Sequence, residues 1–451
     1  MQQKKFGKLN WWILILFGLV GQIAWSVENM YFNLFVFDTI APNLEVITLM
    51  VQLSGVMATV TTLFAGVLSD KYGNRRSFIS YGYAIWGVTV ALFGCISPSL
   101  IQGMFEVSLE KAVSIALVAV VVGDCIMTLF GSTANDASFN AWVTDNTESE
   151  YRGGVEGVLS ILPLGAMLIV AGGFGMLVEA VGYQALFIGL GVVISLCGVA
   201  GIFLIKDSSK LTKNGDLKEI LYGFKPSVIQ QNKSLYLTLL VVLLYGIACQ
   251  VFMPYMIIYM KTYLGFTVIE YSVVFGLAIV LGAAVNLYLT KLSDKKDKVQ
   301  MLYPAAAILS AGLIGMYFAN TKNHVADLFL FGFAGFVMIT GYILVSALCG
   351  ALTRDYTPKD AVGKFQGVRM VFSVLIPMLV GPMIGNAVNK ARNIPLDDLT
   401  SADVMTTQYI PAPEIFLVGG MIALLMFVII PLLKKQNKHA LAKENTEDAQ
   451  V

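Results

Sequence analysis

The sequence predicts an all-α integral membrane protein with about twelve transmembrane helices, arranged as two six-helix repeats. Three observations support this fold class: an apolar composition, the recurrence of long apolar runs, and the same order of motifs in both halves. Of the 451 residues, 57% are hydrophobic and 13% are charged. Soluble domains carry about 25% charged residues, so we expect this chain to lie in a lipid bilayer.

About twelve apolar runs are long enough to cross a ~30 Å hydrocarbon core as helices. The first run is too long for a cleaved signal peptide, and no small-residue cleavage site follows it. In chain order, we expect spans at residues 11–37, 46–69, 77–97, 112–142, 155–180, 183–205, 235–260, 268–290, 300–319, 325–352, 365–389 and 411–433.

Lysine and arginine lie mostly in alternate connections, which sets the expected orientation. With the N-terminus inside, the inner segments carry about 24 basic residues and the outer loops about five. Both termini are therefore expected in the cytoplasm and the protein in the cell membrane. The net charge of +1 hides this asymmetry and gives no reason to expect nucleic acid as a partner.

The longest inner connection, residues 206–234, divides the spans six and six. We expect an N-terminal half at 1–205, a cytoplasmic linker at 206–234, a C-terminal half at 235–433 and a cytoplasmic tail at 434–451. Apolar residues of the linker have helical spacing, which predicts a short helix on the inner membrane surface. A tether between the halves is favoured over a partner-binding role.

Two pairs of similar segments occur in the same order in the two halves. The segment "VLSDKYGNRR" follows span two and "KLSDKKDKVQ" follows span eight, so that Asp70 matches Asp294. The segment "VTDNTESEYRGGVEGV" follows span four and "TRDYTPKDAVGKFQGV" follows span ten, so that Asp145 matches Asp355. Parallel six-helix repeats about an axis along the membrane normal are the architecture of one large transporter class.

The connection between spans two and three, "GVLSDKYGNRR" at residues 66–76, closely resembles the signature of the major facilitator superfamily. Gly66 would let a helix approach closely, Asp70 would accept hydrogen bonds or pair with an arginine, and Gly73 would allow a tight turn. The alternative is a charged loop set only by topology. In that superfamily the loop latches the two halves in the outward-facing state. The resemblance implies a latch of Gly66, Asp70, Gly73, Arg75, Arg76, Asp145, Arg152, Asp294 and Asp355. The second copy departs from the pattern at Asp297 and Lys298, so we expect a weaker latch there.

A narrower resemblance is carried by "GQIAWSVENMYFNLF" in span one and "NDASFNAWVTDNTESEYRGGVEG" at span four and its exit. Both segments are similar to the glycoside–pentoside–hexuronide:cation symporters and the sucrose–proton symporters. This resemblance implies a sugar substrate whose transport is driven by Na⁺ or H⁺. The chain departs from the sucrose-symporter pattern, because residues 112–142 contain no arginine.

Polar residues of span one form a stripe that suits a hydroxylated solute. At 100° per residue, Gln22, Trp25, Ser26, Asn29 and Asn33 fall within about a third of the circumference. An aromatic ring beside amides offers a stacking surface together with donors and acceptors for hydroxyls. In span seven, Gln250, Tyr255 and Tyr259 are expected to line the opposite wall. The alternative for each amide is packing between helices.

Carboxylates inside spans one and four are the candidate cation-coupling groups. A lone charge at the bilayer centre costs at least ~2.5–3.5 kcal/mol, so Glu28 and Asp124 must face a cavity or a partner. Thr128 and Asn135 share the Asp124 stripe, whereas Asp136 points elsewhere. Both histidines, His324 and His439, lie outside the spans. Proton coupling must therefore use carboxylates, and a Na⁺ site would need a carboxylate with neutral oxygens. The alternative for Glu28 is a protonated packing residue.

These features predict a secondary active transporter that couples a cation, H⁺ or Na⁺, to symport of a sugar or glycoside by alternating access, functional as a monomer. The alternative is an exporter of drugs, lipids or other amphiphiles on the same fold. An enzyme is disfavoured because no H-E-x-x-H, G-x-S-x-G or phosphate-loop motif is present. The five cysteines are scattered and lack metal-ligand spacing, so we expect neither a metal nor a cofactor.

Overall fold

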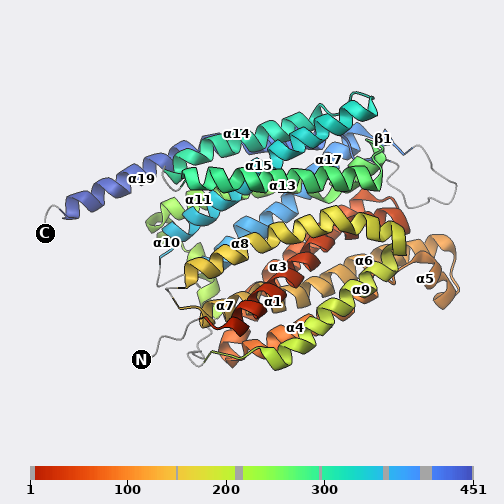
Figure 1. Ribbon diagram of the computed structural model, residues 1–451, viewed down its shortest axis with the longest axis horizontal. Coiled ribbons are helices and arrows are strands. Elements are labelled where there is room, and N and C mark those ends of the chain that lie inside the picture. Colours follow the sequence, from red (N-terminus) through yellow and green to blue (C-terminus); the bar gives the residue numbers. More distant parts are fainter. Residues whose placement is uncertain are drawn as a thin grey trace.

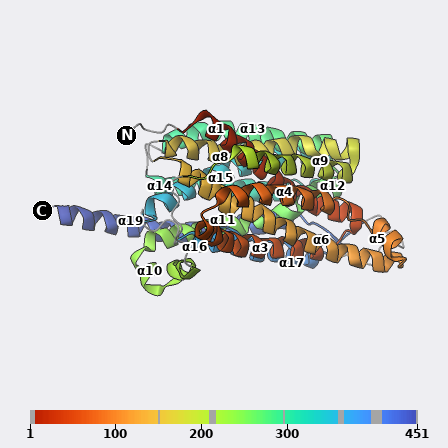
Figure 2. The same cartoon turned by 90° about the horizontal axis from the view of Figure 1, so that it is seen from below.

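The computed structural model is a bundle of long helices that run along its longest dimension (Figure 1). It describes residues 6–148, 151–208, 217–293, 297–358, 365–396 and 409–448. Both termini lie at one end of the bundle, which we call the termini side, and α5 and β1 lie at the opposite end, which we call the far side (Figures 1 and 2). The elements before residue 205 are α1 (Lys8–Val27), η1 (Glu28–Phe32), α2 (Asn33–Phe35), η2 (Val36–Ile40), α3 (Leu44–Tyr72), α4 (Arg75–Phe93), α5 (Pro98–Phe105), α6 (Leu109–Gly131), η3 (Ser132–Phe139), α7 (Asn140–Asn146), α8 (Arg152–Ile169), η4 (Val170–Phe174) and α9 (Gly175–Leu204).

The remaining elements belong to the linker and to the later part of the chain. Here η1 to η4 and η8 are π-helices, and η5 and η6 are 3-10 helices. The elements are η5 (Leu217–Phe224), α10 (Pro226–Gln231), α11 (Lys233–Gln250), η6 (Met253–Tyr255), α12 (Met256–Thr262), α13 (Val268–Ser293), α14 (Lys298–Tyr317), α15 (His324–Tyr356), α16 (Gln366–Met370), η8 (Val371–Leu375), α17 (Ile376–Arg392), β1 (Ile394–Pro395), β2 (Tyr409–Ile410), α18 (Glu414–Leu424) and α19 (Met426–Asp448).

Polar caps and glycines set the ends of several helices. The Asn43 side chain accepts a hydrogen bond from the Val46 amide at the start of α3, and the Asn74 side chain does the same for Ser77 in α4. Such caps satisfy amides that have no partner within the helix. The end of α3 is closed by Gly73, whose φ of 61° is left-handed and favours glycine. The tight turn expected at Gly73 is therefore present.

Ten helical segments of the described residues are long and apolar enough to cross a membrane, and the bent pair α4 and α5 adds an eleventh. One of the ten is the 51-residue segment Gly154–Leu204, which would be about 77 Å long as a straight helix. It is interrupted at Gly182, where φ is 79° and ψ is 164°. The chain turns back there (Figure 1), so this segment makes two crossings and the total reaches the expected twelve. The helix α5 lies between two of the expected spans, where the sequence predicts no helix.

The early and late helices occupy different parts of the bundle: red to yellow helices lie in the lower part of Figure 1 and green to blue helices in the upper part. We call these the first and second halves; their boundaries at residues 205 and 235 stay predictions. The halves meet where α3 packs on α17 and where α13 packs on α8 and η4. Small residues permit this close approach. A side chain at Gly55 would lie 2.6 Å from Met378, and one at Gly175 would lie 2.8 Å from Val268.

The linker joins the halves on the termini side. The short helix expected there is present as η5 and α10. A small separate apolar cluster of Val228, Leu235, Leu239, Phe365 and Val368 fixes this segment against the second half. On the far side, β1 and β2 form one short antiparallel pair in which Ile394 faces Ile410.

Candidate functional site

A buried polar cluster joins three helices of the first half. The Ser54 hydroxyl of α3 donates to Glu28 Oε1 of η1 over 3.0 Å, and the Thr128 hydroxyl of α6 lies 3.2 Å from the same oxygen. The two hydroxyls are 2.8 Å apart, and the Thr128 hydroxyl also lies 2.8 Å from the Asp124 carbonyl oxygen. Glu28 is 8% exposed and Asp124 is 2% exposed. We call Glu28, Ser54, Asp124 and Thr128 the carboxylate cluster.

One oxygen of each acid in the carboxylate cluster is left without a partner. Glu28 Oε2 and Asp124 Oδ1 are buried and make no hydrogen bond to any described residue. A buried charged oxygen is costly unless a donor or a cation satisfies it. The negative charge of Asp124 also acts on Glu28. The cluster can therefore hold a proton or a small cation, for which two hydroxyls and two carboxylates supply oxygen ligands.

Asn135 does not belong to the carboxylate cluster, contrary to the expectation from its stripe. Its Oδ1 lies 2.9 Å from the Tyr83 hydroxyl, and its Nδ2 donates to Asp136 Oδ1 over 3.3 Å. The Ser132 hydroxyl donates to Asp136 Oδ2 over 3.0 Å. The reason is that π-helix η3 begins at Ser132. A π-helix has more residues per turn than an α-helix, so extrapolation at 100° per residue fails beyond Gly131.

The span-one stripe is only partly available to a solute. Gln22, Trp25 and Asn29 are half-buried, whereas Asn33 is buried. The Asn29 amide donates to the Trp25 carbonyl over 2.8 Å, and the Asn33 amide donates to the Asn29 carbonyl over 3.1 Å. One N–H of each side-chain amide is therefore used within its own helix. The Trp25 ring packs on Trp86, with 5.0 Å between ring centroids.

Span seven presents its residues differently from the expectation. Gln250 is half-buried, but Tyr255 and Tyr259 are fully buried. The Tyr255 hydroxyl lies 2.6 Å from the Thr48 hydroxyl of the first half and donates to the Pro382 carbonyl over 2.9 Å. Tyr259 packs against other aromatic rings, including Phe416 at 5.0 Å. The helix breaks after Gln250 and resumes through η6, so a straight-helix projection misplaces both tyrosines, and neither lines the expected wall.

Sequence reasoning missed two groups. Ser54 is one; the signal was a hydroxyl inside span two, in the segment "VQLSGVMA". The other is Tyr245, which is half-buried and packs against Tyr342 of α15 with 5.3 Å between ring centroids. Ser346, one turn along α15 from Tyr342, is exposed. These residues offer the second half an aromatic and hydroxyl surface.

The motif between spans two and three is held together within the first half. Arg75 is 5% exposed, pairs with Asp70 and donates through Nε to Asp145 Oδ2 over 3.1 Å. The Arg76 amide donates to Asp207 Oδ1 over 2.9 Å. A side chain at Gly66 would meet nothing within 4 Å. Close helix approach is therefore not the role of Gly66 in this conformation.

The second copy of the motif has a simpler arrangement. Lys298 Nζ lies 2.6 Å from Asp355 Oδ2, and both side chains are more than a third exposed. Exposed pairs contribute little to stability, and the weaker latch there stays a prediction. Asp294 and the side chain of Arg152 lie outside the described residues.

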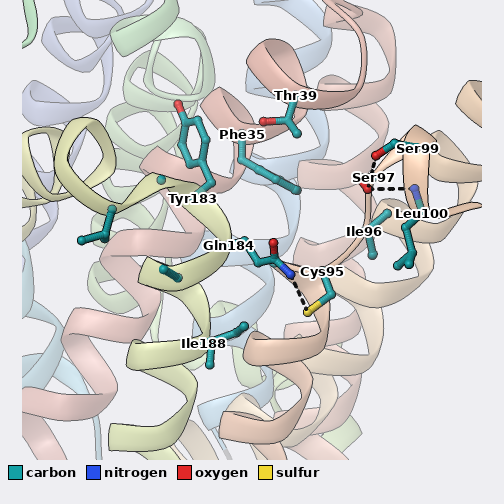
Figure 3. Close-up of a pocket in the computed structure, with 14 residues that line it drawn as sticks. Phe35, Thr39, Cys95, Ile96, Ser97, Ser99, Leu100, Tyr183, Gln184 and Ile188 are labelled. Atoms are coloured by element: carbon teal, nitrogen blue, oxygen red, sulfur yellow. Dashed lines mark hydrogen bonds between the residues drawn. The ribbon is translucent and has the colours of Figure 1, made fainter.

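A hollow of about 780 Å³ lies on the far side of the first half (Figure 3). Its walls come from α2 and η2, the turn between α4 and α5, and the part of α9 that follows Gly182. They include Phe35, Thr39, Cys95, Tyr183 and Gln184. No charged residue lines it, and none of the predicted site residues does. It belongs to one half alone, so it is not the site that two rocking halves would share.

Comparison with known proteins agrees with this architecture. The family model described as Major Facilitator Superfamily matches residues 14–382. The fold is similar to that of the nucleoside transporter NupG (TM-score 0.62, 12% identity, 95% of this chain and 100% of that chain). It is also similar to a bacterial homologue of the iron transporter ferroportin in an outward-facing state (TM-score 0.61, 14% identity, 94% and 98%). A search of curated protein sequences gives no match.

The extent of the family match settles the class of protein. The chain belongs to the Major Facilitator Superfamily, and it is a multi-pass membrane transport protein rather than an enzyme. The two structural neighbours are 12% and 14% identical to this chain, so they support only the fold. The solute must be argued from this chain's own residues.

Proposed function

We propose that this transporter couples a cation, H⁺ or Na⁺, to the symport of a sugar or glycoside by alternating access. The observation that carries the coupling is the carboxylate cluster, in which two buried acids from different helices each leave an oxygen without a partner. Buried acids in a membrane are costly, so they usually mark a functional site. The solute class rests on the span-one stripe and on the resemblance of spans one and four to sugar–cation symporters.

Cation binding would change the stability of the carboxylate cluster directly. Without a cation, the charges of Glu28 and Asp124 repel each other in a site poor in water. A proton or Na⁺ removes this repulsion and draws η1, α3 and α6 together through Ser54 and Thr128. Trp25 and Asn29 lie on the same first span as Glu28, so they would move with it. A bound cation would therefore favour one arrangement of the solute-binding stripe, which is coupling expressed as free energy.

We extend the proposal to placement in the cell. The two termini share one side (Figures 1 and 2), and the excess of lysine and arginine in the connections of that side supports a cytoplasmic location for it. The protein would act as a monomer in the cell membrane, with the far side outside. The two halves, residues 1–205 and 235–433, would rock about the central path while the linker at 206–234 tethers them.

The latch is part of the same proposal. In this structure Asp70 and Arg75 pair within the first half, and we propose that this loop meets the second half once the far side opens. Asp70→Asn should then lower transport and reduce the outward-facing population while expression stays near the parent level. Cysteine accessibility on both sides measures this, and an unchanged labelling pattern would show that the loop is not a latch.

The direct test is an uptake panel with the purified protein in liposomes. Labelled mono- and disaccharides are offered with a Na⁺ gradient or a pH gradient, imposed separately, and protein-free liposomes serve as control. We expect at least one sugar to accumulate above its external concentration under one of the gradients. Absence of accumulation for every sugar under both gradients would refute sugar symport.

The alternative function is export of drugs, lipids or other amphiphiles. The half-buried pair Tyr245 and Tyr342 favours it, because aromatic walls bind amphiphiles well. Efflux of a lipophilic cationic dye from the same liposomes, without any sugar transport, would support this alternative.

A further inference from the structure

Contacts on the far side join the two halves. Asp38 of η2 receives Lys261 of α12, whose Nζ lies 2.7 Å from each carboxylate oxygen. The Tyr183 hydroxyl of α9 donates to Asp38 Oδ2, also over 2.7 Å. Asp38 and Tyr183 belong to the first half and Lys261 belongs to the second. A second pair, Lys390 with Glu45 at 2.8 Å, crosses between the halves nearby.

The two pairs differ in burial and in the number of partners. The side chains of Asp38 and Lys261 are 19% and 43% exposed, whereas those of Glu45 and Lys390 are 51% and 66% exposed. Asp38 also has the Tyr183 hydroxyl as a second partner, while Glu45 has the single bond from Lys390. A charge pair that is shielded and held by several hydrogen bonds is stronger than an exposed one.

Among the described residues, the opposite side of the molecule is joined less firmly. One ion pair between the halves there, Arg354 with Glu156 at 3.3 Å, is exposed on both members. Asn140 of α7 and Ser346 of α15 are exposed although they lie within spans. Polar groups within spans avoid lipid and face protein or water. From these contacts and exposures we infer a conformation closed on the far side and open towards the termini side.

We propose that Asp38, Lys261 and Tyr183 form the far-side gate of this transporter. The proposal rests on the rocking of the two halves but not on the identity of the solute or the coupling ion. Opening the far side separates Lys261 from Asp38, so the pair must break in each transport cycle. Tyr183 keeps the carboxylate directed at Lys261. Its ring borders the hollow of about 780 Å³, with the hydroxyl pointing away from Gln184 and Cys95 (Figure 3), so the ring has room to move when the gate opens.

A distance measurement across the far side tests the gate without any substrate. Spin labels are placed at Glu110→Cys and Val325→Cys, two exposed positions in different halves, after the five native cysteines are replaced by alanine. We expect Lys261→Gln to raise the population at the longer distance at least about fivefold, the lower end of usual coupling between sites. Asp38→Asn should do the same, and Tyr183→Phe should give a smaller rise.

Matched variants separate the gate from a general effect of charge. Lys390→Gln removes the exposed pair on the same side, and we expect the parent distribution of distances. The double variant Asp38→Lys with Lys261→Asp should return most molecules to the shorter distance. An unchanged distribution in both Lys261→Gln and Asp38→Asn, or an equal shift in Lys390→Gln, would overturn the proposal. If one single variant does not stay monodisperse in detergent, the other decides the outcome.

Discussion

Thr128 is the residue through which the carboxylate cluster is connected. Its hydroxyl lies within hydrogen-bonding distance of Glu28, Ser54 and the Asp124 carbonyl oxygen. One hydroxyl cannot donate to all three, so its proton position depends on which acid carries a proton or a cation. The state of the cluster is therefore sensed on three helices at once.

The first prediction concerns the two acids. Asp124→Asn and Glu28→Gln should each abolish gradient-driven accumulation of the solute while exchange across the membrane is partly kept, because the neutral amides need no cation. Uptake and exchange in liposomes measure the two activities. Glu45→Gln, which changes an exposed acid, is the control and should accumulate solute like the parent. Concentrative uptake by the double variant would rule out coupling through these acids.

The second prediction separates two asparagines of one stripe. Asn29 is half-buried and Asn33 is 1% exposed. Asn29→Ala should weaken solute binding by roughly 1–2 kcal/mol, the usual effect of losing a hydrogen-bond partner. Asn33→Ala should mainly lower the thermal unfolding temperature. Calorimetric titration and thermal unfolding in detergent distinguish the effects, and tight solute binding by Asn29→Ala would make the stripe a packing feature.

At the scale of elements, the sequence predicts the positions of the helices better than the direction in which their side chains point. Long apolar runs locate every expected span because burial in lipid requires them. The turn at Gly73 and the association of Glu28, Asp124 and Thr128 follow from residue type and span position. A straight-helix projection gives the wrong facing for Asn135, Tyr255 and Tyr259, because η3 and the break after Gln250 alter the helical period. The residues of an apolar run do not indicate where a π-helix begins, so the direction of side chains beyond it could not be predicted from the sequence.

The third prediction concerns Arg75, which joins the ends of α3, α4 and α7. Arg75→Ala leaves Asp70 and Asp145 facing each other without a cation. Removing one partner from a buried charged pair costs about 3–5 kcal/mol; Asp70 is 41% exposed, so we expect a loss of roughly 1–3 kcal/mol in unfolding free energy. Lys298→Ala, at the exposed pair of the second copy, should cost less than about 1 kcal/mol. Equal losses in thermal unfolding would contradict the difference in burial.

At the scale of the whole molecule, the two halves touch along two helix pairs with similar features. The pair α3 and α17 has Gly55 against Met378, and the contact of α9 with α13 has Gly175 against Val268. The Asp38–Lys261 ion pair and the Tyr255 hydroxyl reinforce the far side of this interface. The glycines allow the helices of the two halves to approach closely, and we propose that the polar contacts determine which side stays closed.

The last prediction tests these glycine contacts. In Gly55→Ala the new methyl carbon would lie 2.6 Å from a Met378 side-chain carbon, and in Gly175→Ala it would lie 2.8 Å from Val268. These separations are shorter than van der Waals contact, so the helices must move apart, at a cost of about 1–3 kcal/mol for overpacking. We expect both variants to unfold at lower temperature and to transport more slowly, because the two halves no longer fit in the far-side-closed state. Gly189→Ala in α9, where a side chain would meet nothing within 4 Å, is the matched control and should transport like the parent. Parent-like transport by both Gly55→Ala and Gly175→Ala would show that the halves do not depend on these contacts to rock.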